Sequence, residues 1–190
     1  MKIFRKIFIW ILGSLITLVL LMMFVVWPIM KSSTKKHSPE QNITYSQGDL
    51  ELHSFYSSPS KKGRVIFGEL VPYNEVWRTG ANEPTTFTTN KDLIIDGKEL
   101  PKGTYTVWTI PGETSWQVIF NSKMHDWGVK FTDQSASRES KDDVVVATVS
   151  PSKSITVAEN FSISFSEAGE GSLMILAWDT TVVPVLLQEK

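Results

Sequence analysis

The chain has 190 residues, enough for one membrane-spanning helix and one domain of about 150 residues. Its net charge is −1; the first thirty residues hold three bases and no acid, so sixteen bases face twenty acids in the rest, a net charge of −4. An acidic domain without clustered Lys and Arg argues against nucleic acid as a partner. The chain has no cysteine, which excludes disulfides, thiolate metal ligands and a cysteine nucleophile.

The N-terminal segment has the composition of a transmembrane helix. Residues 7–30 carry no charged side chain. As a helix this stretch spans about 36 Å, enough to cross a hydrocarbon core of about 30 Å. A cleaved signal peptide needs a shorter apolar run followed by small residues, whereas Trp27 and Pro28 occupy that place. We therefore predict a retained membrane anchor over residues 1–30.

The charges on the two sides of this helix do not decide its orientation in the membrane. Bases stand on both sides, namely Lys2, Arg5 and Lys6 before it and Lys31, Lys35 and Lys36 after it. The positive-inside rule is therefore nearly balanced. A short N-terminal tail and a large acidic domain favour a cytoplasmic N-terminus, with the domain on the outer side, periplasmic or extracellular. Residues 31–42 are polar and aperiodic, so we expect them to form a tether.

The remainder, residues 43–190, has the pattern of a β domain. Short segments rich in Thr, Val, Ile and aromatic residues alternate with Gly, Pro, Asp and Asn. The expected strands are 49–57, 85–89, 93–95, 104–110, 115–121, 144–149, 161–165, 172–178 and 181–187. Such closely spaced strands predict an all-β fold, an antiparallel β-sandwich or jelly-roll-like domain behind a single N-terminal transmembrane helix.

Three details refine this prediction. Asp96-Gly97 is a dipeptide typical of tight hairpin turns. Pro184, inside the last expected strand, indicates an edge or a bulge. Residues 122–142 are polar and predict a long surface loop, with at most a short helical turn.

The residues that suggest a binding site gather in the segment 62–88, where glycines and prolines fix the backbone. The candidate ligand-binding residues are Arg64, Trp77, Arg78, Asn82 and Glu83. A guanidinium can hold a carboxylate or phosphate, an amide can donate and accept, and an indole supplies an apolar wall, a mixture that suits a small polar ligand. The alternative is structural, with Arg78 paired to a nearby Glu and Asn82 bonded within its own turn.

Metal and nucleophile signatures are weaker. A site built from His53, His125, Asp126, Asp142 and Asp143 would need the chain fold to bring them together, because none shows paired metal-ligand spacing. No G-x-S-x-G is present. We therefore expect no catalytic residue, metal or cofactor.

Several motifs in order resemble the domain of unknown function 2911 family over residues 43–187. They include Val76-Trp-Arg-Thr-Gly-Ala-Asn82, Leu100-Pro-Lys-Gly-Thr-Tyr105, Trp116-Gln-Val-Ile-Phe-Asn121 and Trp127-Gly128. The resemblance implies one intact, β-rich domain that is exported, and it assigns no activity. Ser58 and Pro84 depart from the family pattern, which often has Arg and Ala there; a ligand role for that arginine would be weakened in this chain.

The sequence thus predicts a membrane-anchored, outward-facing domain that binds a small polar ligand, an envelope glycan or an envelope partner. One alternative is a hydrolase-like enzyme with Glu83 as general acid or base and Arg78 as anion stabiliser. Another is a purely structural envelope component. The lack of a catalytic signature favours binding over catalysis.

Overall fold

The computed structural model describes residues 2–130 and 132–190. It divides into two compact units, an N-terminal helical unit that ends at His37 and a β unit, Ser38–Lys190. Each unit is described by itself below.

The N-terminal unit is a continuous helical run made of α1 (Lys2–Leu21), the π-helical η1 (Met22–Val26) and α2 (Trp27–His37). The N–H of Trp27 bonds the carbonyl of Met22, five residues back. The next residue, Pro28, has no N–H and cannot continue the ordinary helical pattern, which accounts for the π turn at this point.

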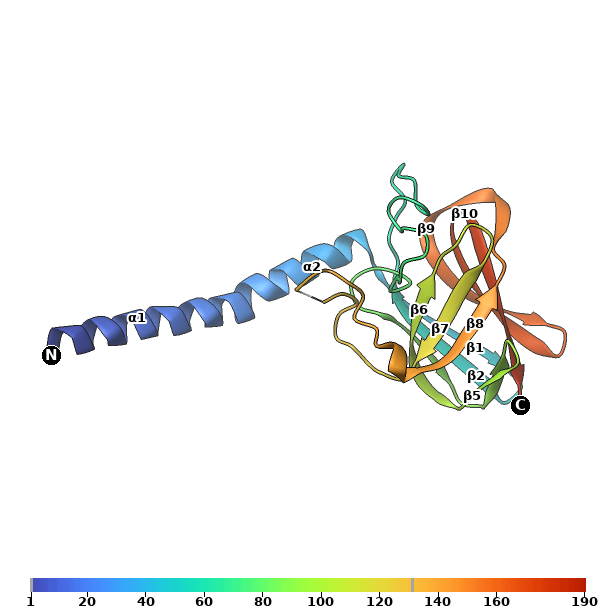
Figure 1. The fold of residues 1–190 in the computed structure, drawn as a ribbon, viewed down its shortest axis with the longest axis horizontal. Coiled ribbons are helices and arrows are strands. Elements are labelled where there is room, and N and C mark those ends of the chain that lie inside the picture. Colours follow the sequence, from blue (N-terminus) through green and yellow to red (C-terminus); the bar gives the residue numbers. More distant parts are fainter. Residues whose placement is uncertain (1, 131) are drawn as a thin grey trace. The chain divides into compact units, whose positions relative to one another are not determined.

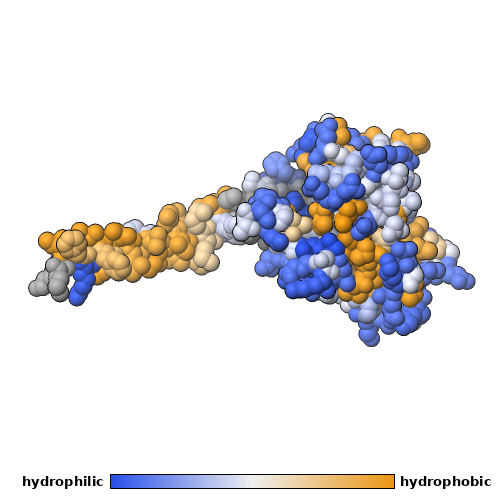
Figure 2. Space-filling view, in the orientation of Figure 1, coloured by the Kyte–Doolittle hydropathy of each residue, from blue (hydrophilic) through white to orange (hydrophobic). Residues whose placement is uncertain are grey.

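The helical run is apolar over most of its length, as Figure 2 shows. Its weakly polar side chains are satisfied internally, since Ser14 Oγ donates to Trp10 O at 2.5 Å and Thr17 Oγ1 to Gly13 O at 2.9 Å. In the described part of the chain this helix is long and apolar enough to cross a membrane, a test that a signal sequence also passes.

In its described residues, 38–130 and 132–190, the β unit has ten strands and one short 3₁₀ helix. The strands are β1 (Glu40–Gln47), β2 (Leu50–Ser57), β3 (Thr85–Thr89), β4 (Leu93–Ile95), β5 (Lys98–Leu100), β6 (Gly103–Ile110), β7 (Trp116–Asn121), β8 (Asp143–Val149), β9 (Ser152–Ala168) and β10 (Gly171–Glu189), with η2 (Ser140–Asp142) before β8.

The strands form two antiparallel sheets that face each other. One sheet has the order β1-β2-β3-β6-β7-β8, and the other has the order β5-β4-β10-β9. Figure 1 shows β6, β7 and β8 side by side in one layer, with β9 and β10 in the other. The expectation of an all-β sandwich behind an N-terminal apolar helix is confirmed.

The core fills the space between the two sheets. Period-2 alternation turns Phe87 of β3 and Phe120 of β7 inward, where their ring centroids lie 5.2 Å apart. From the opposite sheet, Met174, Leu176 and Trp178 of β10 are all at most 2 % exposed. The closely packed core fixes the positions of the strands from which the loops start and end.

The ends of the domain differ in detail from the sequence pattern. The helix runs to His37 and β1 starts at Glu40, so most of the segment predicted as a tether, 31–42, has regular structure; its role as a tether stays a prediction. The two strands expected over 172–187 are one strand, β10. Pro184 lies between the last pair that β10 makes with β9, at Val182, and the first that it makes with β4, at Gln188, so its missing N–H breaks no ladder bond.

Candidate functional site

The loop 122–142 covers the outer face of β6 and β7. Trp108 and Ile119 pair across these strands and point away from the inter-sheet core, yet each is 0 % exposed. His125, from the loop, packs its ring edge-on against Trp108 at a centroid distance of 6.0 Å. The loop therefore encloses a second apolar layer outside the sandwich, which is more than the predicted surface loop would do.

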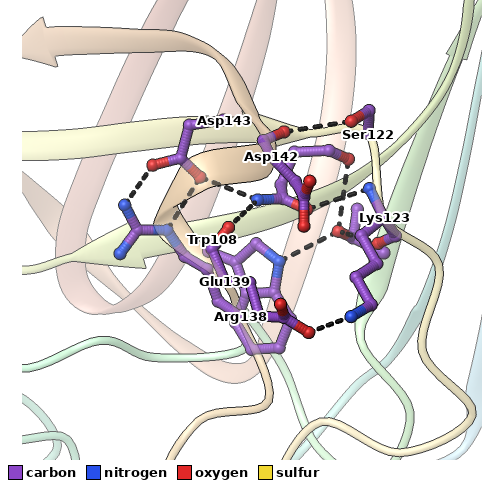
Figure 3. Close-up of polar contacts among 9 residues, drawn as sticks. Trp108, Ser122, Lys123, Arg138, Glu139, Asp142 and Asp143 are labelled. Carbon is purple, nitrogen blue, oxygen red and sulfur yellow. Dashed lines mark hydrogen bonds and ion pairs between the residues drawn. The ribbon is translucent and has the colours of Figure 1, made fainter.

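A hydrogen-bond network closes one end of this loop onto β7 (Figure 3). Asn121, which is 0 % exposed, donates from Nδ2 to Glu139 O and to Asp143 Oδ1, both at 2.8 Å. Its Oδ1 accepts the backbone N–H of Lys123 at 2.9 Å. Every hydrogen-bonding atom of the Asn121 amide thus has a partner, which is the pattern of a structural network.

An ion pair and a buried indole complete the closure. Arg138 donates to both carboxylate oxygens of Asp143, with Nε at 2.9 Å from Oδ1, and the two side chains are only 14 % and 11 % exposed. The Trp108 Nε1–H donates to Thr106 Oγ1 at 2.9 Å, and that hydroxyl donates to Lys123 O at 3.0 Å. These contacts hold the loop in place, and they engage the Trp108 N–H and the Asp143 carboxylate within the protein.

Elsewhere under the loop, polar atoms stay unsatisfied. Four buried side-chain atoms of the described residues have no hydrogen-bond partner, namely Arg78 Nε, Asn82 Nδ2, His125 Nε2 and Asp142 Oδ2. His125 and Asp142 belong to the loop, and Arg78 and Asn82 contact its residue Gly128. Since native proteins leave few such atoms, their gathering at one loop marks the candidate site.

Arg78 is held in an extended segment beside β6. Its neighbour Trp77 forms backbone hydrogen bonds with Thr109 in both directions, at 2.7 and 2.9 Å. The Arg78 side chain lies against Gly128, where even a methyl group would overlap its Cβ and Cδ. Burial lowers the pKa of Arg78 below its usual value. Among the described residues no carboxylate forms an ion pair with this guanidinium.

Asn82 stands in a left-handed backbone conformation, with φ +58°, which asparagine adopts more readily than most residues. Its carbonyl accepts the N–H of Gly128 at 3.1 Å. The side chain is 8 % exposed and its amide nitrogen has no partner in the described part of the chain. Asn82 therefore has a buried amide donor in its side chain, and its backbone carbonyl binds the same loop residue that Arg78 touches.

His125 and Asp142 form the other half of the unsatisfied set. Burial lowers the pKa of His125, Lys123 lowers it further, and the carboxylates of Asp142 and Asp126 act in the opposite direction. Within the described residues no three metal-ligating side chains come together, so the histidine and its acidic neighbours do not form the metal site considered from the sequence.

The other predicted site residues lie elsewhere. Trp77 turns into the core, where its ring stacks on Trp178 at 5.9 Å and 19°. Glu83 accepts a hydrogen bond from Ser57 Oγ at 3.5 Å. Arg64 is exposed and closes its own turn, donating to the carbonyls of Ser60 and Lys61. Of the five predicted residues, Arg78 and Asn82 are the pair that the loop brings together.

Gly128, His125 and Asp142 were not grouped with Arg78 in the sequence. Gly128 is fifty positions from Arg78, and no periodicity links the two segments. One sequence feature does connect them: Val76-Trp-Arg-Thr-Gly-Ala-Asn82 and Trp127-Gly128 are both among the motifs that carry the family resemblance. The structure gives the reason, because Gly128 packs on Arg78 and binds Asn82.

Comparison with known proteins agrees with the resemblance. No curated protein and no solved structure matches the chain. One family model matches residues 38–187, which is nearly the whole β unit, and its description is "Protein of unknown function (DUF2911)". The chain therefore belongs to the DUF2911 family.

Proposed function

We propose that this protein is a membrane-anchored domain on the outer side of the membrane that binds a small anionic ligand, such as an acidic sugar or another group of an envelope glycan, through Arg78 and Asn82. The observation that carries the proposal is that Arg78 Nε and Asn82 Nδ2 are both buried without a hydrogen-bond partner, in two residues that both contact Gly128. Both are hydrogen-bond donors, so the missing partner is an acceptor.

The charge of Arg78 narrows the class of ligand. A buried donor without a partner costs about 1–3 kcal/mol, and a charged donor costs more. A carboxylate or phosphate would supply both the acceptor and the counter-charge, and a guanidinium binds these groups with two parallel hydrogen bonds. A neutral sugar would satisfy the donors but would leave the charge unpaired, so an anionic ligand is the better fit.

The hydrolase hypothesis needs Arg78 and Glu83 to face one substrate. Their described contacts differ, since Arg78 lies against Gly128 and Glu83 binds Ser57 of β2. A binding site built on Arg78 and Asn82 requires no catalytic carboxylate. Binding is therefore the simpler use of these residues.

The proposed location rests on the apolar helix and its flanking charges. Residues 3–37 can span a membrane by length and composition. With the N-terminus cytoplasmic, residues 38–190 lie outside. Protease added to intact cells with a permeabilised outer layer should digest this domain, and its full protection would reverse the orientation.

The ligand proposal is tested by thermal unfolding of the β unit, residues 38–190, in the presence of sugar acids, sugar phosphates, peptidoglycan fragments and neutral sugars. A ligand at a hundred times its dissociation constant adds about 2.7 kcal/mol to stability. We expect an acidic compound to stabilise the parent and the control Arg64→Met, and to leave Arg78→Met unchanged. Equal stabilisation of all three proteins would refute the site.

A further inference from the structure

One end of the sandwich exposes apolar side chains on two loops. The first loop follows β2 and presents Val65 and Leu70, which are 53 % and 44 % exposed. The second is an outward bulge near the start of β9, with Ile155 fully exposed and Val157 53 % exposed. Exposed apolar residues are ordinary when scattered singly, but four branched aliphatic residues on two protruding loops suggest a contact surface if the loops are neighbours.

The bulge in β9 has a fixed shape. Lys153 pairs with Thr181 and Ala158 pairs with Asp179, so four residues of β9 stand against one of β10. The N–H of Thr156 donates to Ser154 Oγ at 3.0 Å, which turns the chain between Ile155 and Val157. The apolar side chains are thus presented outward by the local backbone.

The two loops are neighbours. The N–H of Lys61 donates to Glu159 O at 2.6 Å, and the Lys61 ammonium pairs with Asp179 at 2.6 Å. Glu159 and Asp179 directly border the bulge. Figure 1 shows the loop after β2 and the beginning of β9 at the same end of the domain.

The domain also begins at this end. Pro39, the second residue of the β unit, accepts the N–H of Ser58 at 2.9 Å, and Ser58 Oγ donates to Phe161 O at 2.6 Å. Ser58 leads into the first apolar loop, and Phe161 follows the bulge by three residues. Pro39 is thus connected to the residue that leads into the first loop and, through Ser58, to the strand segment that follows the bulge.

We propose that Val65, Leu70, Ile155 and Val157 form a lipid-contact surface that dips into the interfacial region of the membrane to which the protein is anchored. This inference rests on the proposed membrane anchoring, because Ser38 alone separates the end of α2 at His37 from Pro39, and this short connection limits how far the residues bonded to Pro39 can lie from a bilayer that the helix spans. Aliphatic side chains on a fixed loop gain free energy when they enter the headgroup and acyl boundary.

The charges at this end decide what kind of lipid is needed. Basic residues (Lys62, Arg64 and Lys153) stand among acidic residues (Glu69 and Glu159). The bases in this set outnumber the acids by only one, so its net attraction to anionic lipid is weak. Contact is therefore driven by the apolar side chains and occurs on zwitterionic vesicles.

The test uses the full chain, which has no cysteine, so one introduced cysteine carries one label. Ile155→Cys is labelled with an environment-sensitive fluorophore and reconstituted in phosphatidylcholine vesicles that contain a shallow nitroxide lipid. The matched control is Glu170→Cys, in the turn between β9 and β10 at the far end of both strands. We expect the label at 155 to lose about half of its fluorescence or more and the label at 170 to keep it.

A second variant separates insertion from mere proximity. With the label at Val65→Cys, the double substitution of Ile155→Asp and Val157→Asp should reduce quenching about tenfold or more, because charged side chains do not enter the boundary. Equal fluorescence at positions 155 and 170 in membrane-bound protein would overturn the lipid surface alone. Release of the chain from vesicles would instead overturn the anchor. Quenching in native membranes but not in pure lipid would assign the surface to a protein partner and refute the proposal.

Discussion

Gly128 packs directly on the side chain of Arg78, so closely that no side chain larger than hydrogen fits at this position. A Cβ atom at position 128 would stand 2.9 Å from Arg78 Cβ, below the closest approach that real Cβ atoms show. The contact ties a surface loop to a buried guanidinium fifty residues earlier in the chain.

Gly128→Ala is therefore expected to loosen the loop. Alanine at a compatible position stabilises by about 0.4–1 kcal/mol through the unfolded chain. Overpacking costs about 1–3 kcal/mol, so the overlap with Arg78 prevails and the melting temperature falls. Scanning calorimetry of the parent and the variant measures this difference.

A double-mutant cycle identifies the cause. In an Arg78→Ala background the Cγ and Cδ atoms that obstruct the new methyl group are gone, so Gly128→Ala should cost less than it does in the parent. Additive effects would show that Gly128→Ala acts through some other contact.

Arg78, which packs against the loop, and Arg138, which belongs to it, are expected to respond in opposite ways to substitution by methionine. Arg78 has no described ion pair, so Arg78→Met removes an uncompensated buried charge and should leave the ligand-free domain as stable as the parent or about 1 kcal/mol more stable. Arg138→Met leaves the buried carboxylate of Asp143 without its ion-pair partner and should lower the free energy of unfolding by about 3–5 kcal/mol.

Urea unfolding of both variants measures these free energies. If Arg78→Met lowers the free energy of unfolding as much as Arg138→Met does, then Arg78 stabilises the fold and the ligand-binding proposal loses its support. A stable Arg78→Met that no longer responds to ligand would identify the unpaired charge as the functional group, retained at a cost to stability.

The fold was predictable because its signals are local. Asp96 and Gly97 have φ values of +51° and +70°, the positive pair that a tight I′ turn demands, and the expected strand β4 precedes them; the short β5 that follows the turn was not among the expected strands. By contrast, strand β1 was not predicted. Its only two apolar residues, Ile43 and Tyr45, stand among polar ones, so the sequence shows too little alternation to indicate a strand. In the structure both side chains pack against the core. Strand periodicity can be read from a sequence, but tertiary partners cannot.

The sequence offers candidate residues for a site, but it does not tell which of them lie together. Trp77 and Arg78 are adjacent in sequence and were assigned to one ligand site, yet consecutive residues of an extended segment point to opposite sides. The indole packs in the core and the guanidinium packs under the loop. The residues that Arg78 faces come from a loop with no periodicity, so no local pattern could name them.

Trp77 should accordingly affect stability and not ligand choice. Its ring stacks on Trp178 and its Nε1–H donates to Gly80 O at 3.1 Å. Trp77→Leu should lower the free energy of unfolding by about 2–4 kcal/mol. Isothermal titration of the folded variant should return the parent's affinity for the acidic ligand. Lost affinity at unchanged stability would place the indole in the binding site.

The stability of the domain should fall at mildly acidic pH because of His125. Burial lowers the pKa of this imidazole below its usual 6.5, so the unfolded chain binds the proton more tightly than the folded protein does. Its contribution is therefore fully present above about pH 6.5 and is lost as the pH falls through the folded-state pKa. Melting temperatures measured from pH 8 to pH 5 should decline across this window.

His125→Gln isolates this contribution, because glutamine cannot take up a proton. The melting temperature of the variant should fall less steeply between pH 6.5 and pH 5 than that of the parent. Asp142→Asn gives a second check: removing a carboxylate that raises the pKa of His125 lowers its folded-state pKa further, so the decline should begin near the same pH and continue to lower pH than in the parent. Identical pH profiles for the parent and His125→Gln would show that protonation of this buried histidine does not govern acid stability.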